Sequence, residues 1–533
     1  MLWRPRPARV HAPAVSALSV RHRDGAPRPR GPRGAARALA LLALLPACGG
    51  LPLDYPRTVS YAFDQPEQTS VGRLFGAAAE AHPGLSGVYP VRYGQDAFNG
   101  RMAMADLAER SLDLQYYIWS GDTTGRMLVE RLLAAADRGV RVRVLLDDIG
   151  VGDRGARISA LGGHPNVEVR SFNPFAARGK LLDMVLDAGR VNHRMHNKLM
   201  VMDGALAMVG GRNIGDHYFG VDTGSNFRDL DLIAAGPAVR EMSALFDEFW
   251  NDLHSIPFDA FVREPATPDA ARAALHEELV DVDYPYELEH DLAKIMNHLE
   301  GVRDRLIWAP VEVLHDDPSK VIDADAKIVR RLREVISGAE QELHLEVSYF
   351  VPTERGVETM RELVERGVEV RVLTNSLVTN DVLAAHSGYA NYREEMLEAG
   401  VDLYELRPDP DVMHRWSRLS AESRASLHTK ALVVDERLVF IGSFNMDPRS
   451  AHINMEVGLL VDSPELGALV AAHLDEGVLP DNAFRLLLDT DGDVVWLSVV
   501  GGRLLAFNKD PHSGWWQRFN AWFLGILPIE DQL

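Results

Sequence analysis

Two copies of one short motif hold the residues of this sequence that are best suited to chemistry. The first copy begins at His196 and the second at His428. In each copy a Lys follows the His by two positions, an Asp by seven and an Asn by seventeen. These residues are Lys198, Asp203 and Asn213 in the first copy and Lys430, Asp435 and Asn445 in the second. Because one constellation recurs with the same offsets, we expect both copies to build one active site.

The residue types indicate chemistry at a phosphodiester. An imidazole titrates near neutrality and serves as nucleophile, base or acid. The negative charge of a phosphodiester must be stabilised in the transition state, and Lys198 and Lys430 supply positive charge for it. One histidine would attack phosphorus while the other protonates the leaving alcohol and then activates the acceptor. We expect His196, Lys198, Asp203, His428, Lys430 and Asp435 to form the catalytic set.

Two alternatives stay open at this point. Asp203 and Asp435 could be turn residues only, because turns favour Asp at such positions. A metal site would need three or four ligands, and the spacing brings no such set together. We therefore expect neither a metal nor another cofactor.

The elements that position the motif are strands. Residues two apart on a strand point to the same face, so the His and Lys of each copy should project together. Asp203 and Gly204 predict a tight hairpin that leads into a returning strand over residues 207–209. The pairs at 210–211 and 442–443 permit a close backbone approach to a ligand.

The motif copies sit in a larger internal repeat. Residues 112–119 and 343–350 are strand-like, and each leads through a helix-periodic stretch to an Arg-Gly-Val and a second strand. The Arg-Gly-Val segments begin at Arg138 and Arg366, and their glycine is typical of a helix end. One strand, helix, strand unit is therefore used twice in an α/β chain.

Composition limits the function classes. The chain has 533 residues, 46% apolar and 25% charged, with a formal charge of −21, although residues 1–37 hold nine Arg and one Asp. An acidic body argues against a nucleic-acid partner, which needs a basic face. It would also be repelled by anionic lipid, so contact with a membrane surface would need an anchor or an apolar insertion.

The single cysteine, Cys48, excludes an internal disulfide framework. It ends a short apolar run that follows Arg33 and Arg37 and precedes two glycines, as in a secretory signal. The Leu-Pro-Ala-Cys ending resembles a bacterial lipoprotein box, in which Cys48 is lipidated; the alternative is a short apolar helix with an incidental cysteine. We expect a lipid-anchored envelope protein, with the outer membrane favoured by Gly49.

The predicted organisation has six parts. They are a leader (1–48), an N-terminal segment (49–90), a first repeat (91–254), a connector (255–320), a second repeat (321–462) and a C-terminal extension (463–533). In the extension, aromatic and apolar residues recur at helical spacing: Trp515, Trp516, Phe519, Trp522, Phe523 and Ile526. This face would either meet a membrane interface or pack on its own protein, and packing is the commoner case.

The sequence resembles the phospholipase D superfamily, whose signature is His-x-Lys-x4-Asp followed by Gly-Gly/Ser-x-Asn. Strings such as RMHNK, VGGRNIGDHYFG, SYFVPT, SLHTK and IGSFNMDPRS are especially similar to bacterial cardiolipin synthases of the C type. The resemblance covers nearly the whole chain after residue 70. It implies two pseudo-symmetric repeats of the phospholipase D type, each a mainly parallel or mixed sheet flanked by helices, packed around one shared site.

The resemblance also implies residue roles and a metal-free reaction through a phosphohistidine. Residues that would bind or orient the phosphate are Asn213, Ser443, Asn445, Asp229 and Glu456. Glu456 matches a carboxylate that orients a catalytic histidine in relatives. The first repeat offers Asp229 or Asp231 for that role, of which we favour Asp229, and it has Gly211 where the second has Ser443. We expect His196 to be the nucleophile.

Several reactions fit this family. We expect transfer of a phosphatidyl group to phosphatidylglycerol, with phosphatidylethanolamine as a second phospholipid substrate. The alternative is hydrolysis of phospholipids to phosphatidic acid. Two further hypotheses are a nuclease and a non-catalytic membrane-binding protein. The acidic body argues against the nuclease, and two intact motifs argue against lost activity. The sequence leaves head-group preference and oligomeric state open.

Overall fold

A nine-stranded sheet carries the first His-Lys motif. In the computed structural model its order is β10-β1-β8-β6-β5-β2-β3-β4-β9. β2, β3 and β4 run parallel, whereas β5 pairs antiparallel with β2. The strands are β1 (Ser86–Val91), β2 (Ser111–Ile118), β3 (Arg141–Gly150), β4 (Val167–Phe172), β5 (Lys198–Met202), β6 (Leu206–Gly210), β8 (Asp231–Ala235), β9 (Ser255–Pro257) and β10 (Ile307–Ala309).

A ten-stranded sheet carries the second motif, with the order β11-β18-β17-β16-β12-β13-β14-β19-β20-β21. Its strands are β11 (Val311–His315), β12 (Glu342–Val347), β13 (Glu369–Asn375), β14 (Asp402–Leu406), β16 (Lys430–Val434), β17 (Leu438–Gly442), β18 (Val457–Asp462), β19 (Ala483–Leu488), β20 (Val494–Val500) and β21 (Arg503–Phe507). The run β8-β6-β5-β2-β3-β4 of the first sheet recurs as β18-β17-β16-β12-β13-β14. The predicted mixed α/β repeats are thereby confirmed.

The described residues are 51–150, 161–175, 187–261, 268–279, 282, 284–321, 327–410 and 423–533. The predicted leader and its Cys48 lie outside them. Residues 50–533 form one compact unit. Strands from outside the predicted repeats extend both sheets: β9, β10 and β11 come from the predicted connector, and β19, β20 and β21 come from the predicted extension. For example, β10 pairs with β1, and β19 pairs with β14.

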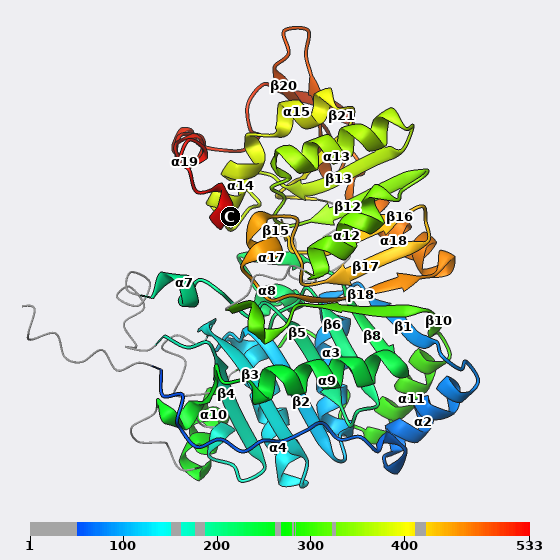
Figure 1. Ribbon diagram of the computed structural model, residues 1–533, viewed down its shortest axis with the longest axis vertical. Helices are drawn as coiled ribbons and strands as arrows, with labels where there is room; N and C mark the ends of the chain where they lie inside the picture. The colour runs from blue at the N-terminus through cyan, green and yellow to red at the C-terminus, as the bar shows by residue number, and fades with distance from the viewer. Residues whose placement is uncertain are drawn as a thin grey trace, which may run out of the picture. The chain divides into compact units, whose positions relative to one another are not determined.

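Helices cover both sheets, and Figure 1 shows α9 lying across the first. The helices are α2 (Ser70–Glu80), α3 (Gly94–Leu107), α4 (Thr123–Asp137), α7 (Ala188–Val191), α8 (Asp216–Phe219), α9 (Pro237–Asn251), α10 (Pro268–Leu279), α11 (Leu292–Arg303), α12 (Lys327–Ser337), α13 (Thr353–Glu365), α14 (Leu383–Ala390), α15 (Arg393–Glu398), α17 (Pro448–His452), α18 (Pro464–Gly477) and α19 (Trp515–Gly525). Short 3-10 turns are η1 (Pro66–Gln68), η3 (Phe258–Ala260), η4 (Pro318–Val321) and η5 (Glu530–Gln532). Among the described residues, no helix has the length and apolar character needed to cross a bilayer.

The repeated Arg-Gly-Val ends a helix in both repeats, as predicted. Gly139 follows α4 with φ of +93° and Gly367 follows α13 with φ of +89°. This left-handed conformation is readily adopted by glycine and lets the chain turn directly into β3 and β13. The helix beginning is also encoded, because the side chain of Asp122 caps α4 by accepting from the backbone of Gly125 at 3.2 Å.

The two repeats share a buried core. One apolar cluster contains Val201 and Val209 of the first sheet together with Val433 and Ile441 of the second. A separate two-stranded parallel sheet joins the repeats, formed by β7 (Ser225–Arg228) and β15 (Arg424–Leu427). Because both motifs lie next to these shared contacts, their relative placement is set by packing rather than by the connector.

The C-terminal aromatic face differs from the commoner case expected from sequence. In α19 only Ala521 is buried, and the side chains of Trp515, Trp516 and Trp522 are more than half exposed. The helix lies beside α14, as the red and yellow-green helices of Figure 1 show. The expectation that this stripe packs on its own protein is therefore wrong, because α19 turns its small residue inward and its large ones to solvent.

Candidate active site

Backbone pairing between the repeats places the two motif histidines. The N–H of His196 donates to the carbonyl of Met455 at 2.8 Å, and the N–H of His428 donates to the carbonyl of Arg228 at 2.8 Å. Each acceptor comes from the opposite repeat and directly precedes a carboxylate residue. The pairing therefore sets the register that brings a carboxylate of one repeat to the histidine of the other.

The histidine and carboxylate pairs cross between the repeats. Nδ1 of His196 lies 2.8 Å and 3.0 Å from the two carboxylate oxygens of Glu456. Nδ1 of His428 lies 2.7 Å from Oδ2 of Asp229. All four side chains are buried. Since a carboxylate accepts, each imidazole donates its Nδ1 proton and keeps a lone pair on Nε2. Among the described residues, neither Nε2 atom has a hydrogen-bond partner.

Burial keeps both imidazoles neutral. It lowers the pKa of His196 to about 4, against the opposing effect of Glu456, and the nearby Lys198 and Lys430 act in the same direction as burial. The pKa of His428 lies well below its ordinary value for the same reasons. Burial acts to raise the pKa of Glu456, but His196, the ammonium of Lys198 and the hydroxyl of Ser443 hold that pKa below its ordinary value. The site thus contains neutral nitrogen bases beside positive charge, which suits an anionic phosphoester.

The two lysines lie in equivalent places and lack carboxylate partners. Each ammonium donates to the carbonyl oxygen of the histidine two residues earlier. The ammonium of Lys430 also donates to Oγ of Ser348 at 2.8 Å. No carboxylate of the described chain lies within ion-pair distance of either lysine. Burial lowers the pKa of both, that of Lys430 to about 8.

The motif asparagines are held by the strands that precede the motifs. Oδ1 of Asn213 accepts from the backbone of Ile118 at 3.1 Å, and its Nδ2 donates to the hydroxyl of Tyr218 at 2.9 Å. Oδ1 of Asn445 accepts from Ser348 Oγ at 2.9 Å. The hydroxyl of Ser348 therefore links Asn445 to the lysine of the same motif. Each asparagine is thereby joined to a residue beside the second motif: Tyr218 contacts the ring of His428, and Ser348 accepts from Lys430.

Ser443 contacts a carboxylate partner. Its hydroxyl donates to Glu456 Oε2 and accepts from the backbone of Val457 at 3.0 Å. The equivalent Gly211 has no room for a side chain, because a Cβ there would lie 2.1 Å from Asp229 Oδ1. The difference between the repeats is thus steric, since the carboxylate of Asp229 fills the space beside Gly211.

Of the two carboxylates considered in the first repeat, Asp229 is the one at a histidine. Asp231 instead pairs with Arg101 at 3.1 Å and Arg212 at 3.3 Å. Burial raises the pKa of Asp229, against the opposing charge of Lys430. The preference for Asp229 agrees with this geometry.

The motif aspartates lie at the far ends of their strands. The carboxylate of Asp203 accepts from the backbones of Glu109, Arg110 and Ser111 at 2.7 to 2.9 Å. Asp435 binds the equivalent residues 340–342 in the second repeat. Both have φ of +52°. Five residues of extended strand, roughly 17 Å, separate each from its histidine. The catalytic assignment of Asp203 and Asp435 is therefore corrected to a turn role that anchors the start of β2 or β12.

Aromatic side chains that the motif analysis did not identify surround the histidines. The ring of Tyr117 lies 4.8 Å from that of His196 and 5.4 Å from the ammonium of Lys198. The rings of Tyr218 and Phe227 each lie 5.1 Å from that of His428. These contacts exclude water from the imidazole faces. For Tyr117, the indication in the sequence was its position near the end of the repeated strand, where the second repeat has Ser348.

Tyr349 connects the second motif to the protein surface. Its ring lies 5.7 Å from the ammonium of Lys430, and its hydroxyl donates to Oδ1 of Asp381 at 2.9 Å. Asp381 is exposed and precedes α14. Burial raises the pKa of the Tyr349 hydroxyl well above its ordinary value, so it stays a donor.

Side-chain bonds to the backbone support the segments just before each histidine. Oδ2 of Asp147 accepts from the backbone of Met195 at 2.9 Å, while its Oδ1 pairs with Arg194 at 3.2 Å. Asn375 binds both backbone groups of Leu427, each at 2.8 Å. Such clamps restrict the backbone on which each imidazole is carried.

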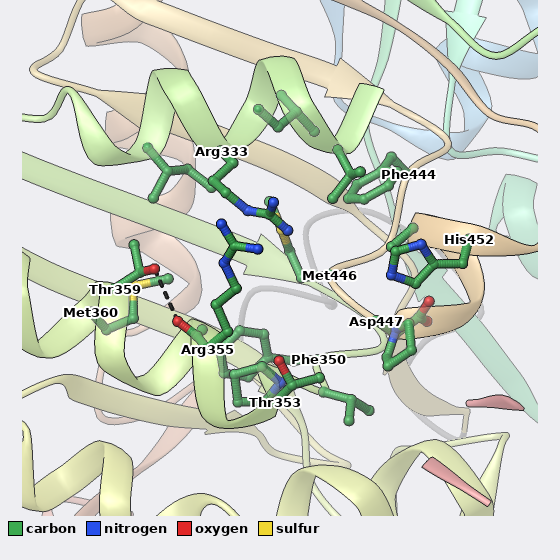
Figure 2. A pocket seen from close by; sticks show the side chains of 18 residues that line it. Arg333, Phe350, Thr353, Arg355, Thr359, Met360, Phe444, Met446, Asp447 and His452 are labelled. Carbon is green, nitrogen blue, oxygen red and sulfur yellow. Dashed lines mark hydrogen bonds between the residues drawn. The ribbon is translucent and has the colours of Figure 1, made fainter. Parts of the chain in front are cut away.

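A cavity of about 220 Å³ lies behind the second motif loop, between α12 and α13. Phe444 and Met446 line it, whereas Asn445 between them faces Ser348. Figure 2 shows the guanidinium groups of Arg333 and Arg355 near one another in this cavity. No motif histidine or lysine lines it, so this space is separate from the site.

One group of possible metal ligands occurs in the described chain. The ligand atoms of Glu248, His315 and Asp317 lie within 4.8 Å of one another. The group includes neither motif histidine, and exposed acidic groups of this kind are common without an ion.

Comparisons with known proteins identify the family to which the sequence is related. A family model described as cardiolipin synthase, PLD-like domain, matches residues 102–250 and 332–477. Cardiolipin synthase C of Escherichia coli strain K12 is 38% identical over 461 residues, which is 84% of this chain and 96% of that protein. Cardiolipin synthase of Geobacillus kaustophilus strain HTA426 is 28% identical over 421 residues, 76% of this chain and 71% of that one.

A solved structure shares the fold. Phosphatidylserine synthase from Haemophilus influenzae Rd KW20 matches with a TM-score of 0.52 and 14% sequence identity. The match covers 78% of this chain and 92% of that one. The two repeated sheets thus form an architecture known from another protein.

Proposed function

This chain is an enzyme of the phospholipase D family, and we propose that it is a cardiolipin synthase-like phosphatidyltransferase whose acceptor is phosphatidylglycerol. The observation that carries the proposal is the pair of crossed contacts, His196 with Glu456 and His428 with Asp229. They leave two neutral imidazoles, each with a free Nε2, beside two ammonium groups that have no carboxylate partner among the described residues. Such a site can hold a phosphodiester and divide nucleophilic and proton-transfer work between two histidines.

In the first step, Nε2 of His196 attacks the phosphorus of the donor phospholipid. An N–P bond forms and the P–O bond to the head-group alcohol breaks. The leaving oxygen takes its proton from His428. The negative charge of the bound diester favours protonation of His428, which is otherwise neutral, and Asp229 stabilises the imidazolium. The products are a phosphatidyl group on His196 and the free head-group alcohol.

In the second step, neutral His428 removes the proton of a hydroxyl of phosphatidylglycerol. The resulting oxygen attacks phosphorus, the N–P bond breaks, and His196 is released. Atoms balance without an added co-reactant: two molecules of phosphatidylglycerol give cardiolipin and glycerol. With phosphatidylethanolamine as donor, ethanolamine leaves instead. No cofactor enters either step.

The charge on phosphorus is carried by groups of both repeats. Lys198 and Lys430 face the diester with no carboxylate to neutralise them. Asn213 and Asn445 add amide donors to the same cluster. Ser443 acts through Glu456, whose carboxylate it helps to hold. Because these donors are positioned before substrate arrives, little reorganisation is needed in the transition state.

The proposed partners are phospholipids in a membrane. Lipidation of Cys48 would hold the acidic chain at the bilayer, and Gly49 after it favours the outer membrane of an envelope. Mass spectrometry of the mature N-terminus tests the anchor directly. A diacylglyceryl-modified Cys48 is expected; an N-terminus without lipid would contradict it.

An assay with two lipids tests the reaction. The purified full chain is incubated with phosphatidylglycerol and phosphatidylethanolamine, and products are resolved by mass spectrometry. Cardiolipin is expected, together with released glycerol or ethanolamine. His298→Ala, at an exposed histidine of α11, is the matched control for substitutions of the motif histidines in this assay. Phosphatidic acid without cardiolipin would make the enzyme a hydrolase, and cleavage of neither lipid would reject the proposed substrate class.

A further inference from the structure

Helix α19 presents an apolar face to solvent that no other part of the described chain covers. Seven large side chains on or just after the helix are between 37% and 66% exposed. They are Trp515, Trp516, Phe519, Trp522, Phe523, Ile526 and Leu527. The aromatic rings contact one another, as between Trp515 and Phe519 at 5.4 Å. An exposed cluster of this kind is typical of a binding surface.

The composition of this face favours a lipid interface. Trp is enriched where apolar chains meet head groups, because its ring is apolar and its N–H is polar. The segment 503–529 also departs from the acidic character of the whole chain. It contains Arg503, Lys509 and Arg518, and its single acidic residue, Asp510, pairs with Arg393 at 2.9 Å. Residues 503–529 thus carry a net charge of 3 − 1 = +2, and the acidic Glu530 and Asp531 come directly after them. In a chain of charge −21, this segment complements an anionic lipid surface.

The residues that follow α19 tie it to the segments flanking both motifs. Nδ2 of Asn192, four residues before His196, donates to Gln532 at 2.7 Å. Arg449, four residues after Asn445, donates from its backbone to Leu533 and from its guanidinium to the carbonyl of Asn192 at 2.9 Å. A surface that bound α19 would therefore be held near the loops of both motifs.

α19 also rests on the helix that begins at the edge of the site. The carbonyl of Gly525 accepts from Asn391 Nδ2 at 3.0 Å, at the end of α14. The beginning of α14 follows Asp381, the exposed partner of Tyr349. Val382, next to it, is 41% exposed. α14 thus connects the edge of the site, where Val382 is exposed, to α19.

We propose that the exposed face of α19 is a membrane-docking surface that inserts its aromatic side chains among anionic phospholipids and holds the active site against the bilayer. The choice of lipid as occupant rests in part on the proposed phospholipid reaction. The surface is distinct from the Cys48 anchor: a lipid anchor tethers the chain, whereas α19 orients it.

A fluorescent label on the helix tests insertion without any turnover. Cys48 is the only cysteine, so Cys48→Ser with Phe523→Cys gives a full chain with one labelling site. A polarity-sensitive dye there is expected to shift to the blue with phosphatidylglycerol vesicles and to be quenched by nitroxides on the acyl chains. The matched control carries the dye at Leu292→Cys, 52% exposed on α11, and should remain in water. Equal responses at both positions would overturn the proposal.

A triple variant tests the energetic contribution. Trp515→Ser, Trp516→Ser and Trp522→Ser are expected to lower vesicle binding by on the order of a hundredfold in the Cys48→Ser chain, with the circular dichroism unchanged. Leu253→Ser, Leu292→Ser and Leu479→Ser remove exposed apolar groups elsewhere and should leave binding unchanged. If the triple Trp variant binds vesicles normally but converts a sedimenting dimer to a monomer, the face binds a second copy and the membrane proposal is wrong.

Activity separates this proposal from the proposed reaction. On short-chain phosphatidylglycerol dispersed without bilayers, the triple Trp variant should keep the activity of the parent chain, and on vesicles its KM should rise. A chain that inserts α19 but transfers no phosphatidyl group would refute the reaction alone. A chain that transfers normally without insertion would refute the docking surface alone.

Discussion

Nδ1 of His428 lies 2.7 Å from Oδ2 of Asp229, a carboxylate supplied by the opposite repeat. The reciprocal contact joins His196 to Glu456 at 2.8 Å. Each repeat thus provides the imidazole for one half of the site and the carboxylate for the other. A substitution of either carboxylate should therefore affect the histidine of the opposite repeat, which is far away in the sequence.

Asp229→Asn should alter the state of His428 and leave that of His196 unchanged. The amide cannot stabilise the imidazolium, so transfer should slow by about 10²- to 10⁴-fold, as when the acid of a hydrolytic triad is replaced. Nitrogen NMR of labelled histidine checks which ring changes its tautomer or titration. A change confined to His196 would contradict the crossed arrangement.

His196→Ala and His428→Ala should each abolish turnover while preserving the fold, since each histidine has a separate task. The two variants should differ with a donor whose leaving group needs no protonation. His428→Ala should then still form the phosphatidyl adduct, visible as added mass on the intact chain, and His196→Ala should form none. An adduct in His196→Ala only would reverse the assigned roles.

Asp203→Asn should lower stability rather than catalysis. The amide retains one of the two oxygens that accept from residues 109–111, so we expect a loss of about 2 kcal/mol in the free energy of unfolding. Activity per folded molecule should stay within a few-fold of the parent. Urea denaturation followed with the transfer assay separates the two effects. A large loss of activity in fully folded protein would return Asp203 to the catalytic set.

Gly211→Ala should be more damaging than Ser443→Ala, although the two positions are equivalent. A Cβ at position 211 would meet Asp229 Oδ1 at 2.1 Å and displace the carboxylate from His428. Ser443→Ala removes one hydrogen bond to Glu456 and should cost roughly tenfold in kcat. Steady-state kinetics of the two variants tests this prediction. Similar losses of activity in both would argue against the steric explanation.

The pH profile of kcat/KM should fall above pH 8. Burial lowers the pKa of Lys430 to about 8 from its ordinary value of 10.5, so this lysine is charged below pH 8 and neutral above it. Loss of that charge weakens binding of the anionic diester, so kcat/KM should fall by up to tenfold per pH unit. Initial rates measured between pH 6 and pH 10 in buffers of constant ionic strength check this decrease in kcat/KM. A profile that is flat to pH 9.5 would show that Lys430 keeps its proton.

Much of the site followed from sequence because the motif offsets encode local geometry. His and Lys two apart on a strand share a face, and the duplicated Arg-Gly-Val set the helix ends. The same reasoning could have placed Asp203 correctly, since five extended residues carry it away from His196. The crossed placement of the two carboxylates could not be predicted from local offsets. It depends on backbone pairing of Met455 with His196, a contact between residues far apart in the chain.

Two further features were beyond periodicity alone. The spacing of aromatic residues in α19 predicts a face but not which side of it meets the protein, and burial of Ala521 alone decides that. Tyr117 lies near the end of β2 and Tyr349 lies two residues after β12, and this position alone does not identify either as a neighbour of a lysine. Their positions beside Lys198 and Lys430 follow from strand register, which pairs Tyr116 with Lys198 and Val347 with Lys430.

The reciprocal exchange of carboxylates bears on how such a chain could have arisen. Two identical molecules that meet about a two-fold axis necessarily lend each other the same residues, so a crossed site is what a symmetric homodimer would possess. Fusing the two copies into one gene removes the requirement that they remain identical. Gly211 with Asp229 and Ser443 with Glu456 are the kind of divergence that fusion allows. Neither half could then regain independence by simple separation, since each would leave behind the acid that its own histidine needs.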